Sequence, residues 1–218
     1  MVALQGSLFG WREPALEAAP ACERVVLGEG AWVDIARGWL SGADTLLDTL
    51  VRDVPWQQGR RRMYDRVLDD PRLSCWYAAG TPLPHPVLTT MRSALGKRYG
   101  VRFGSLGCNY YRSGRDSVAP HRDRELRRLD DTLVAIVTLG VTRPFLIRPL
   151  GGGRSRDLGP GAGDLLVMGG RCQAAFEHAV PKSSVSGPRV SVSYRWAAPA
   201  GTSPGTVPEG LAASITPG

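Results

Sequence analysis

Short apolar segments, rich in β-branched and aromatic residues, follow one another through the second half of the chain. Gly, Pro and Asp separate them. Segments of this length and spacing are typical of the strands of an all-β sandwich or barrel. We therefore predict a β core over residues 103–198. Its strands are expected in FGSLGCNYY, TLVAIVTLG, RPFLIRPL, GDLLVMGG, AAFEHAV and RVSVSYRWA.

The first half of the chain carries helical spacing instead. Residues 31–40 and 42–54 place apolar side chains three and four positions apart, as amphipathic helices do. Residues 84–100 begin with Pro and end with Gly, the usual punctuation of a helix. The remaining expectations are short strands at residues 23–29 and 73–80 and a polar, basic loop at residues 57–72.

These patterns fit one domain. A chain of 218 residues is long enough for one generous domain, and no internal repeat is visible. We expect an α+β fold, mainly β, over residues 21–198, in which a helical N-terminal layer packs on the β core. Residues 1–20 are expected to form a partly ordered arm, and residues 199–218, rich in Gly, Pro, Ser and Thr, a disordered tail.

The composition is ordinary for a soluble globular protein, with 43% hydrophobic and 22% charged residues. No apolar run is long enough to cross a membrane, and the N-terminus lacks the pattern of a secretory signal. The four cysteines include no CxxC pair. We therefore expect reduced thiols, no membrane contact and a cytoplasmic protein.

The net charge of +7 favours a polyanionic partner, most commonly nucleic acid. However, only Lys97 and Lys182 of the 27 basic residues are lysine. Such a bias is also typical of genome-wide codon usage. The charge alone therefore does not identify a function.

A candidate metal site lies in the stretch HRDRE, residues 121–125. In an extended strand the side chains of His121 and Asp123 point to the same face. An imidazole and a carboxylate are two ligands of the two-His-one-carboxylate triad of non-haem Fe(II) oxygenases. A second histidine is needed, and the chain offers His85 and His178. His85 lies between prolines and is interpreted as a loop or capping residue, whereas His178 lies in a predicted strand and is preferred.

A second, independent signal lies in the last strand, RVSVSYRWA. Arg189 and Ser191 alternate with valines and share one face. If that face looks into the β core, a guanidinium is buried there, which is costly without a partner. A dicarboxylate cosubstrate would supply that partner through a bidentate pair. The plainer alternative is an exposed edge strand with its arginines in water.

Taken in order, these residues resemble the AlkB family. The motifs are Asn-x-Tyr, His-x-Asp-x-Glu, a distant His, and Arg-x-Ser-x-x-x-Arg, running from about residue 108 to 196, with weaker similarity back to about residue 55. Members are Fe(II)- and 2-oxoglutarate-dependent dioxygenases that remove alkyl groups from nucleobases. The resemblance implies a double-stranded β-helix, or jelly-roll, core at residues 103–198 and a nucleotide-recognition lid at about residues 55–85.

The resemblance also implies roles for individual residues. Iron would be bound by His121, Asp123 and His178. The distal carboxylate of 2-oxoglutarate would be held by Arg189, Tyr111 and Ser191, and the iron-chelating end would lie near Asn109 and Arg195. The substrate base would meet Glu125 at its exocyclic amine, with Arg60, Arg61 and Arg62 on the phosphates. Trp76 and Tyr77 either stack on the base or pack in the core, and both interpretations stay open.

The reaction implied is oxidative demethylation with O2, in which 2-oxoglutarate becomes succinate and CO2. Bases such as 1-methyladenine or 3-methylcytosine in DNA would be repaired, with release of formaldehyde. The alternatives are the same chemistry on RNA, a protein or a small molecule, by a protein we expect to be a monomer. A non-catalytic nucleic-acid-binding module is less favoured, because it leaves the candidate triad and the arginine strand unexplained.

Overall fold

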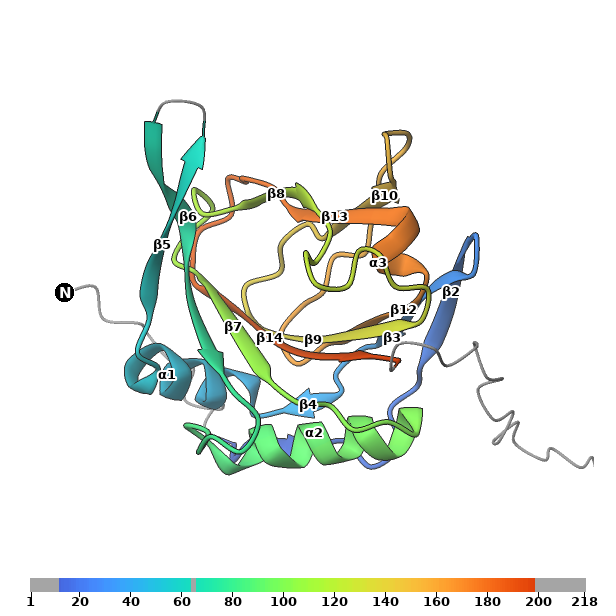
Figure 1. Cartoon of the computed structure of the whole chain (residues 1–218). Helices are drawn as coiled ribbons and strands as arrows, with labels where there is room; N and C mark the ends of the chain where they lie inside the picture. The colour runs from blue at the N-terminus through green and yellow to red at the C-terminus, as the bar shows by residue number, and fades with distance from the viewer. Residues whose placement is uncertain (1–11, 64–65, 199–218) are drawn as a thin grey trace, which may run out of the picture.

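The computed structural model describes residues 12–63 and 66–198, apart from the side chains of residues 61–63, 66 and 67. Two antiparallel sheets face each other, and two helices cover the outer face of the larger one (Figure 1). The larger sheet contains, in spatial order, β2 (Glu23–Gly28), β3 (Ala31–Ala36), β12 (Leu165–Gly170), β9 (Thr132–Gly140), β14 (Arg189–Ala197), β7 (Leu106–Tyr111), β6 (Arg66–Tyr77) and β5 (Gln57–Met63).

The smaller sheet closes the other side of the sandwich (Figure 1). Its strands are β11 (Arg156–Asp157), β10 (Leu146–Pro149), β13 (Phe176–Val180) and β8 (Val118–His121). A short pair, β1 (Ala15–Leu16) with β4 (Leu40–Ser41), and the helices α1 (Ala43–Asp53), α2 (Pro86–Tyr99) and α3 (Cys172–Ala175) complete the described elements. The predicted fold class, a mainly β structure in which a helical layer packs on a core of two sheets, is confirmed.

Two apolar cores hold these layers together, one on each face of the larger sheet. In β9, Leu133 and Val137 face the helices, whereas Val134 and Ile136 face the smaller sheet. This explains the uninterrupted apolar run TLVAIVTLG, because a strand covered on both faces has no polar side. Strand β14 differs, since only one of its faces is apolar. The opposite face carries Arg189 and Ser191 into the interior between the sheets.

Two predicted helices are confirmed. Helix α2 begins after His85, whose Nδ1 accepts the backbone N–H of Val87 at 3.2 Å, and ends at Gly100, which has the left-handed φ of 67°. The proposed capping role of His85 is therefore correct. Helix α1 buries Leu46 and Leu50 against the larger sheet.

The helix predicted at residues 31–40 is wrong, because residues 31–36 form strand β3. This strand lies between β2 and β12 and is buried on both faces, so its apolar residues fall at spacings that imitate a helix. The pairing of Asp34 with Arg24 across β2 and β3 adds a polar contact that a helix would not allow. Beyond it, Gly38 turns the chain with a φ of 59°.

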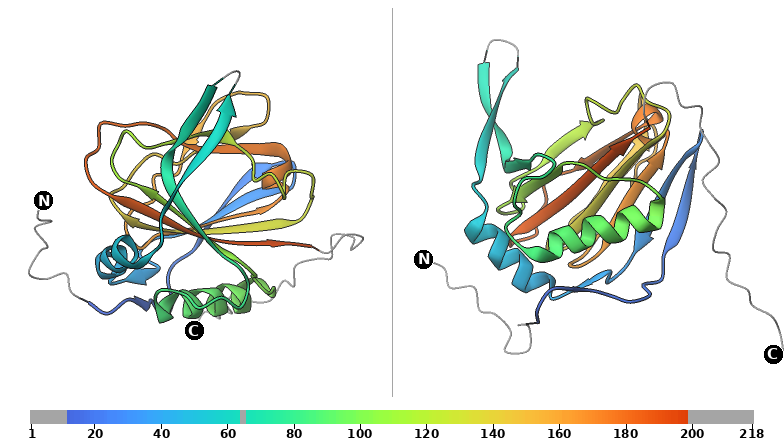
Figure 2. Two further views of the ribbon diagram at one scale, coloured as in Figure 1. Left: turned by 60° about the vertical axis from the view of Figure 1, so that its left-hand side comes forward. Right: turned by 60° about the horizontal axis from the view of Figure 1, so that its bottom comes forward.

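The loop predicted at residues 57–72 is also wrong. The described residues of this range, 57–63 and 66–72, lie in the β5–β6 hairpin, which projects beyond the body of the sandwich (Figures 1 and 2). The sequence QQGRRRMYDRVLDDPR has no regular apolar alternation, so the usual strand signal is missing. The pairing of β6 with β7 over residues 73–77 anchors the hairpin to the sheet.

The expectations for the chain ends fall largely outside the described residues. Residues 1–11 and 199–218 are not described, and the part of the predicted arm that is described contains β1. Among the described residues, no helix combines the length and apolar character needed to cross a membrane.

A buried guanidinium ties loops from both sheets together. Arg143, between β9 and β10, is only 1% exposed. It donates hydrogen bonds to the carbonyl oxygens of Ser113 at 3.0 Å, Asp116 at 2.8 Å and Pro181 at 2.6 Å. Arg143 thus joins the connection after β7 to the connection after β13.

We expect Arg143→Ala to lower the free energy of unfolding by roughly 3 kcal/mol or more, because several buried carbonyl groups lose their donor. Urea unfolding measures this. Arg52→Ala, which removes an exposed guanidinium paired with its neighbour Asp53, is the control and should change stability by less than ~0.5 kcal/mol. Equal losses in the two variants would contradict the bracing role of Arg143.

Candidate active site

The two candidate histidine ligands lie opposite each other on neighbouring strands of the smaller sheet. His121 ends β8 and is the register partner of His178 in β13. Their ring centroids are 4.3 Å apart, and Phe145 stacks on His178 at 5.6 Å. Cross-strand register, rather than proximity in sequence, therefore brings the two imidazoles together.

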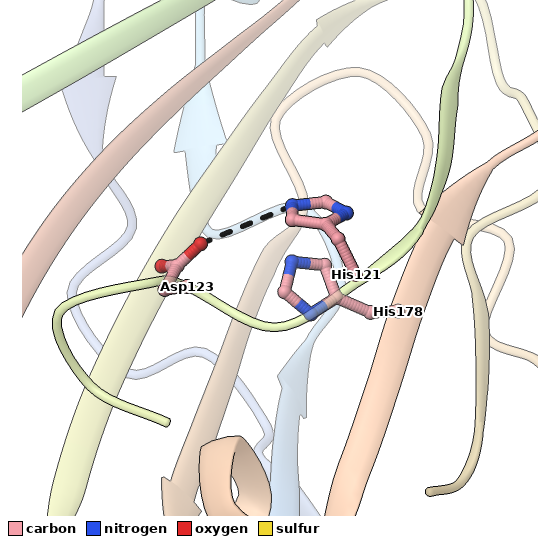
Figure 3. Close-up of side chains that lie close together, drawn as sticks. All are labelled: His121, Asp123 and His178. Atoms are coloured by element: carbon pink, nitrogen blue, oxygen red, sulfur yellow. Dashed lines mark ion pairs between the residues drawn. The ribbon is translucent and has the colours of Figure 1, made fainter. Parts of the chain in front are cut away.

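Asp123 completes the cluster from outside the strand. The sequence argument placed residues 121–125 in one extended strand, but β8 ends at His121 and a turn follows. The reason is local: the backbone N–H of Asp123 donates to the buried side chain of Gln173 at 2.9 Å, and Leu126 turns back into the core. Asp123 still points toward the histidines (Figure 3), with its Oδ1 3.9 Å from Nε2 of His121.

Together, one nitrogen from each histidine and one carboxylate oxygen lie within 4.8 Å of one another. Burial lowers the pKa of His178 to about 3 and also lowers the pKa of His121, so both imidazoles are neutral near pH 7. Burial pushes the pKa of Asp123 upward, but Arg195 and the two histidines outweigh it and hold this pKa below its ordinary value. These are the protonation states that a metal requires.

The tautomer of His121 also suits a metal. Its Nδ1 lies 3.0 Å from the carbonyl oxygen of Ala119, to which it can only donate. The proton therefore sits on Nδ1, and Nε2, the atom that faces Asp123, is left as a ligand. The donor set of two neutral imidazoles and one carboxylate fits a non-haem Fe(II) site.

A second feature of the interior is the buried guanidinium of Arg189. Arg189 is fully buried, and its Nη2 donates to the hydroxyl of Thr138 at 3.2 Å. Its Nε and Nη1 have no partner. Burial lowers the pKa of Arg189, and the ring of Tyr111 lies 5.3 Å from its guanidinium carbon. A buried cation with two unpaired donors is costly, and an anionic ligand such as a carboxylate would compensate its charge.

The other predicted cosubstrate residues line the cavity next to the histidines. Asn109, Tyr111 and Ser191 lie on its wall, with Asn109 and Ser191 paired in register across β7 and β14. Arg195 lies beside the metal cluster, and its Nε donates to Asp123 Oδ2 at 2.7 Å. The structure thus brings together the predicted iron residues and the predicted 2-oxoglutarate residues.

A wider cleft of about 660 Å³ opens above this cavity. Trp76 lines it, is 55% exposed and packs over the Arg195 guanidinium at 5.4 Å. Gly107 lies beneath this contact, because a Cβ there would come within 3.1 Å of the Trp76 ring and 3.0 Å of Arg195 Nη1. Glu125 also lines the cleft, 3.7 Å from Arg195 Nε.

The remaining predicted substrate residues are placed differently. Tyr77 follows Trp76 on the strand, points to the other face and packs against the helical core. Arg60 lines the cleft but pairs with Asp69 at 3.2 Å. The side chains of Arg61 and Arg62 lie outside the described residues.

The comparisons with known proteins agree with this geometry. Residues 77–195 match the 2OG-Fe(II) oxygenase superfamily. The chain is 33% identical over 222 residues to alpha-ketoglutarate-dependent dioxygenase alkB homolog 3 of Mus musculus, covering 86% of this chain and 78% of the mouse protein. The chain belongs to the AlkB family of 2OG-Fe(II) oxygenases.

Two further similar proteins have lower sequence identity to this chain. The DNA oxidative demethylase ALKBH2 of Arabidopsis thaliana is 26% identical, covering 87% of this chain and 74% of the plant protein. A prolyl hydroxylase from Trichoplax adhaerens shares the fold at a TM-score of 0.56 and 12% identity, covering 74% and 82% of the two chains. As an AlkB-family dioxygenase, the chain uses Fe(II), 2-oxoglutarate and O2.

Some residues of this AlkB-family site escaped the sequence analysis. Arg72 donates to Asn109 Oδ1 at 2.9 Å and lines both the cavity and the cleft. Thr138 and Gln173 hold Arg189 and Asp123 respectively. No sequence pattern distinguishes these three residues. Ser193 is different, because it continues the alternation of Arg189 and Ser191 and could have been found from it.

Replacing any one of the three proposed ligands should remove metal binding. We expect His121→Ala, Asp123→Ala and His178→Ala each to weaken Mn(II) affinity by more than about 100-fold, the upper range for losing only an outer-shell partner. Calorimetric titration of Mn(II) into each variant measures this.

His85→Ala is the matched control, since it removes the other histidine. It should keep full metal affinity while losing about 1 kcal/mol of stability with the helix cap. Retained metal binding in a ligand variant, or its loss in His85→Ala, would overturn the assignment.

Arg189→Ala should weaken 2-oxoglutarate binding very roughly 30-fold to several thousand-fold, because truncating one partner of a desolvated charge pair costs ~2–5 kcal/mol. Arg189→Lys keeps the charge without the fork and should recover only part of the affinity. Titration of 2-oxoglutarate into the Mn(II) form measures both. Mn(II) affinity without 2-oxoglutarate should stay unchanged, and an unchanged 2-oxoglutarate affinity in Arg189→Ala would refute this cosubstrate pocket.

Proposed function

We propose that this dioxygenase oxidatively demethylates N-alkylated bases, such as 1-methyladenine and 3-methylcytosine, in DNA and so repairs alkylation damage. The observation that carries the proposal is the shared cleft. An exposed aromatic ring, Trp76, and a carboxylate, Glu125, line the same cleft as His121 and Asp123. Its volume of about 660 Å³ is in the range of small-molecule sites.

His121, Asp123 and His178 would hold the iron, and Arg189 with Tyr111 and Ser191 would hold 2-oxoglutarate. Bound Fe(II) supplies the activation of O2 that couples decarboxylation of 2-oxoglutarate to hydroxylation of the N-methyl group. The hydroxymethyl group then leaves the base as formaldehyde, while the cosubstrate leaves as succinate and CO2. The protein's own contribution is to position the two carboxylate ends and the methyl group and to limit access of water.

The walls of the cleft favour a cationic, flat substrate. The Trp76 side chain would be available for stacking, since the residue is 55% exposed although Arg195 packs on its ring at 5.4 Å. A base stacked there would be extruded from its strand, as base-modifying enzymes require. Glu125 would then accept a hydrogen bond from the exocyclic amine, and its charge suits a methylated, positively charged base.

DNA is preferred as the substrate because the Arabidopsis relative is a DNA oxidative demethylase. The net charge of +7 agrees with a polyanionic partner. A module that only binds nucleic acid is less favoured, because it would offer no ligand for the two unpaired nitrogens of buried Arg189.

The test is turnover of a single-stranded DNA oligonucleotide that contains 1-methyladenine. With Fe(II) and 2-oxoglutarate, the protein should release formaldehyde and succinate in equal amounts and restore adenine, as mass spectrometry would show. The unmethylated oligonucleotide should give no formaldehyde. Methylated RNA run in parallel decides the preferred nucleic acid, and absence of repair on both would refute the proposed function.

Trp76→Ala, set against Tyr77→Phe, tests the stacking wall. Loss of base stacking costs ~1–3 kcal/mol, so KM for the oligonucleotide should rise roughly 5- to 150-fold in Trp76→Ala. Tyr77→Phe should leave KM unchanged because Tyr77 faces the helical core. Substrate-independent turnover of 2-oxoglutarate should persist in both variants. An unchanged KM in Trp76→Ala would exclude stacking at this position.

A further inference from the structure

The turn that follows the Asp123 ligand has two chemically different sides. The backbone N–H groups of Leu126 and Arg127 both donate to the carbonyl oxygen of Asp123 at 3.0 Å, which closes one helical turn. Leu126 is buried and Leu129 packs against the same core. At helical spacing, Arg124, Arg127 and Arg128 fall on one side (i, i+3 and i+4), opposite the two leucines. All three arginines are exposed.

These three arginines lack side-chain partners within the described part of the chain. Some exposed arginines are neutralised there by a carboxylate, as in Arg52 with Asp53 and Arg60 with Asp69, whereas the three of this turn are clustered and have no such partner. Two of the acids near the turn, Glu125 and Asp130, are already engaged. Glu125 lies 3.7 Å from Arg195, and Asp130 pairs with Arg171. The turn therefore presents three uncompensated positive charges, which we call the arginine turn (Arg124, Arg127 and Arg128).

The arginine turn adjoins the catalytic cleft. Arg124 lines the cleft and directly follows Asp123 in the chain. The other cleft-lining arginines already have partners. Arg60 pairs with Asp69, Arg72 donates to Asn109, and Arg195 holds Asp123. Arg122 donates to two carbonyl oxygens. Among the described residues that line the cleft, Arg124 is thus the arginine free to meet an anion.

We propose that the arginine turn binds the phosphodiester backbone of the nucleic-acid strand whose base enters the cleft. Guanidinium groups match phosphate oxygens as bidentate donors, and displacement of counterions from the strand drives the binding. This proposal rests on the proposed function, because that function makes the partner a nucleic acid. The sequence analysis expected Arg60 on the β5–β6 hairpin to contact the phosphates. The proposal assigns this role mainly to the arginine turn, on another wall of the cleft.

The experiment measures binding of an unmodified single-stranded DNA oligonucleotide by fluorescence anisotropy across a series of salt concentrations. Each lost phosphate contact on a single strand flattens the salt dependence by ~0.7, so Arg127→Ala/Arg128→Ala should reduce the slope by about 1.4. At ~0.1 M salt the same relation predicts roughly 25-fold weaker binding. Both residues are exposed, and circular dichroism would verify that the fold is unchanged.

The matched control is Lys97→Ala/Arg102→Ala, which removes two exposed charges at the end of α2, on the outer face of the larger sheet. Its slope should equal that of the unaltered protein. Arg127→Lys/Arg128→Lys keeps the charges and should retain most of the slope. An unchanged slope in the alanine pair, an equally flattened slope in the control, or no binding by the unaltered protein would each overturn the proposal.

This assay needs neither turnover nor a methylated base. Binding with the predicted salt dependence but without demethylation would therefore refute the proposed function while supporting the arginine turn. Demethylation by the unaltered protein, together with an unchanged salt-dependence slope in Arg127→Ala/Arg128→Ala, would support the proposed function and refute the role of the arginine turn.

Discussion

The register between β8 and β13 determines where the two histidines of the candidate metal site lie. Because His121 stands opposite His178, two imidazoles from segments 57 residues apart in the chain face each other at 4.3 Å. A shift of one residue in either strand would turn one ring to the other face of the sheet. Phe145 packs on His178 and Gln173 fixes the start of the turn that delivers Asp123, so neighbouring contacts support the same register.

Three arginines lie in or next to the interior of the sandwich, and each has a different set of partners. Nη1 and Nη2 of Arg143 donate to backbone carbonyl groups, which gives this residue a structural role. Nε and Nη1 of Arg189 have no partner, which is unfavourable in the isolated protein and supports the proposal that a carboxylate ligand binds there. Arg195 is shared between Asp123, Glu125 and the Trp76 ring, and thereby links the metal carboxylate to the wall of the cleft.

The fold alone does not choose the substrate. The Trichoplax prolyl hydroxylase has the same architecture at a TM-score of 0.56. What differs between such enzymes is the surface around the metal. In this chain that surface consists of the β5–β6 hairpin on one side and the turn after Asp123 on the other. Both carry arginines, but only those of the turn are without partners among the described side chains.

The sequence by itself determined the chemistry of the centre. Three histidines, one HxD pair and one strand with alternating Arg and Ser, with the family resemblance that they carry, indicated the ligand set, but they left open whether Arg189 is buried or exposed. The strongly apolar strands and the helices α1 and α2 were also predictable, because apolar periodicity and, for α2, the flanking Pro and Gly are local signals. Local signals failed where burial on both faces imitated a helix, in β3, and where a polar hairpin hid its strands, in β5 and β6.

Only the tertiary structure decided which groups meet. Asp123 reaches the histidines from a turn, not from the strand that alternation suggested, because Gln173 and Leu126 bend the chain there. Trp76 and Tyr77 are neighbours in sequence, yet one lines the cleft and the other packs in the core, since the pairing of β6 with β7 assigns their faces. Residue types and spacing fix which chemistry is available. Cross-strand register and burial fix where it is assembled, because those contacts join residues far apart in the chain.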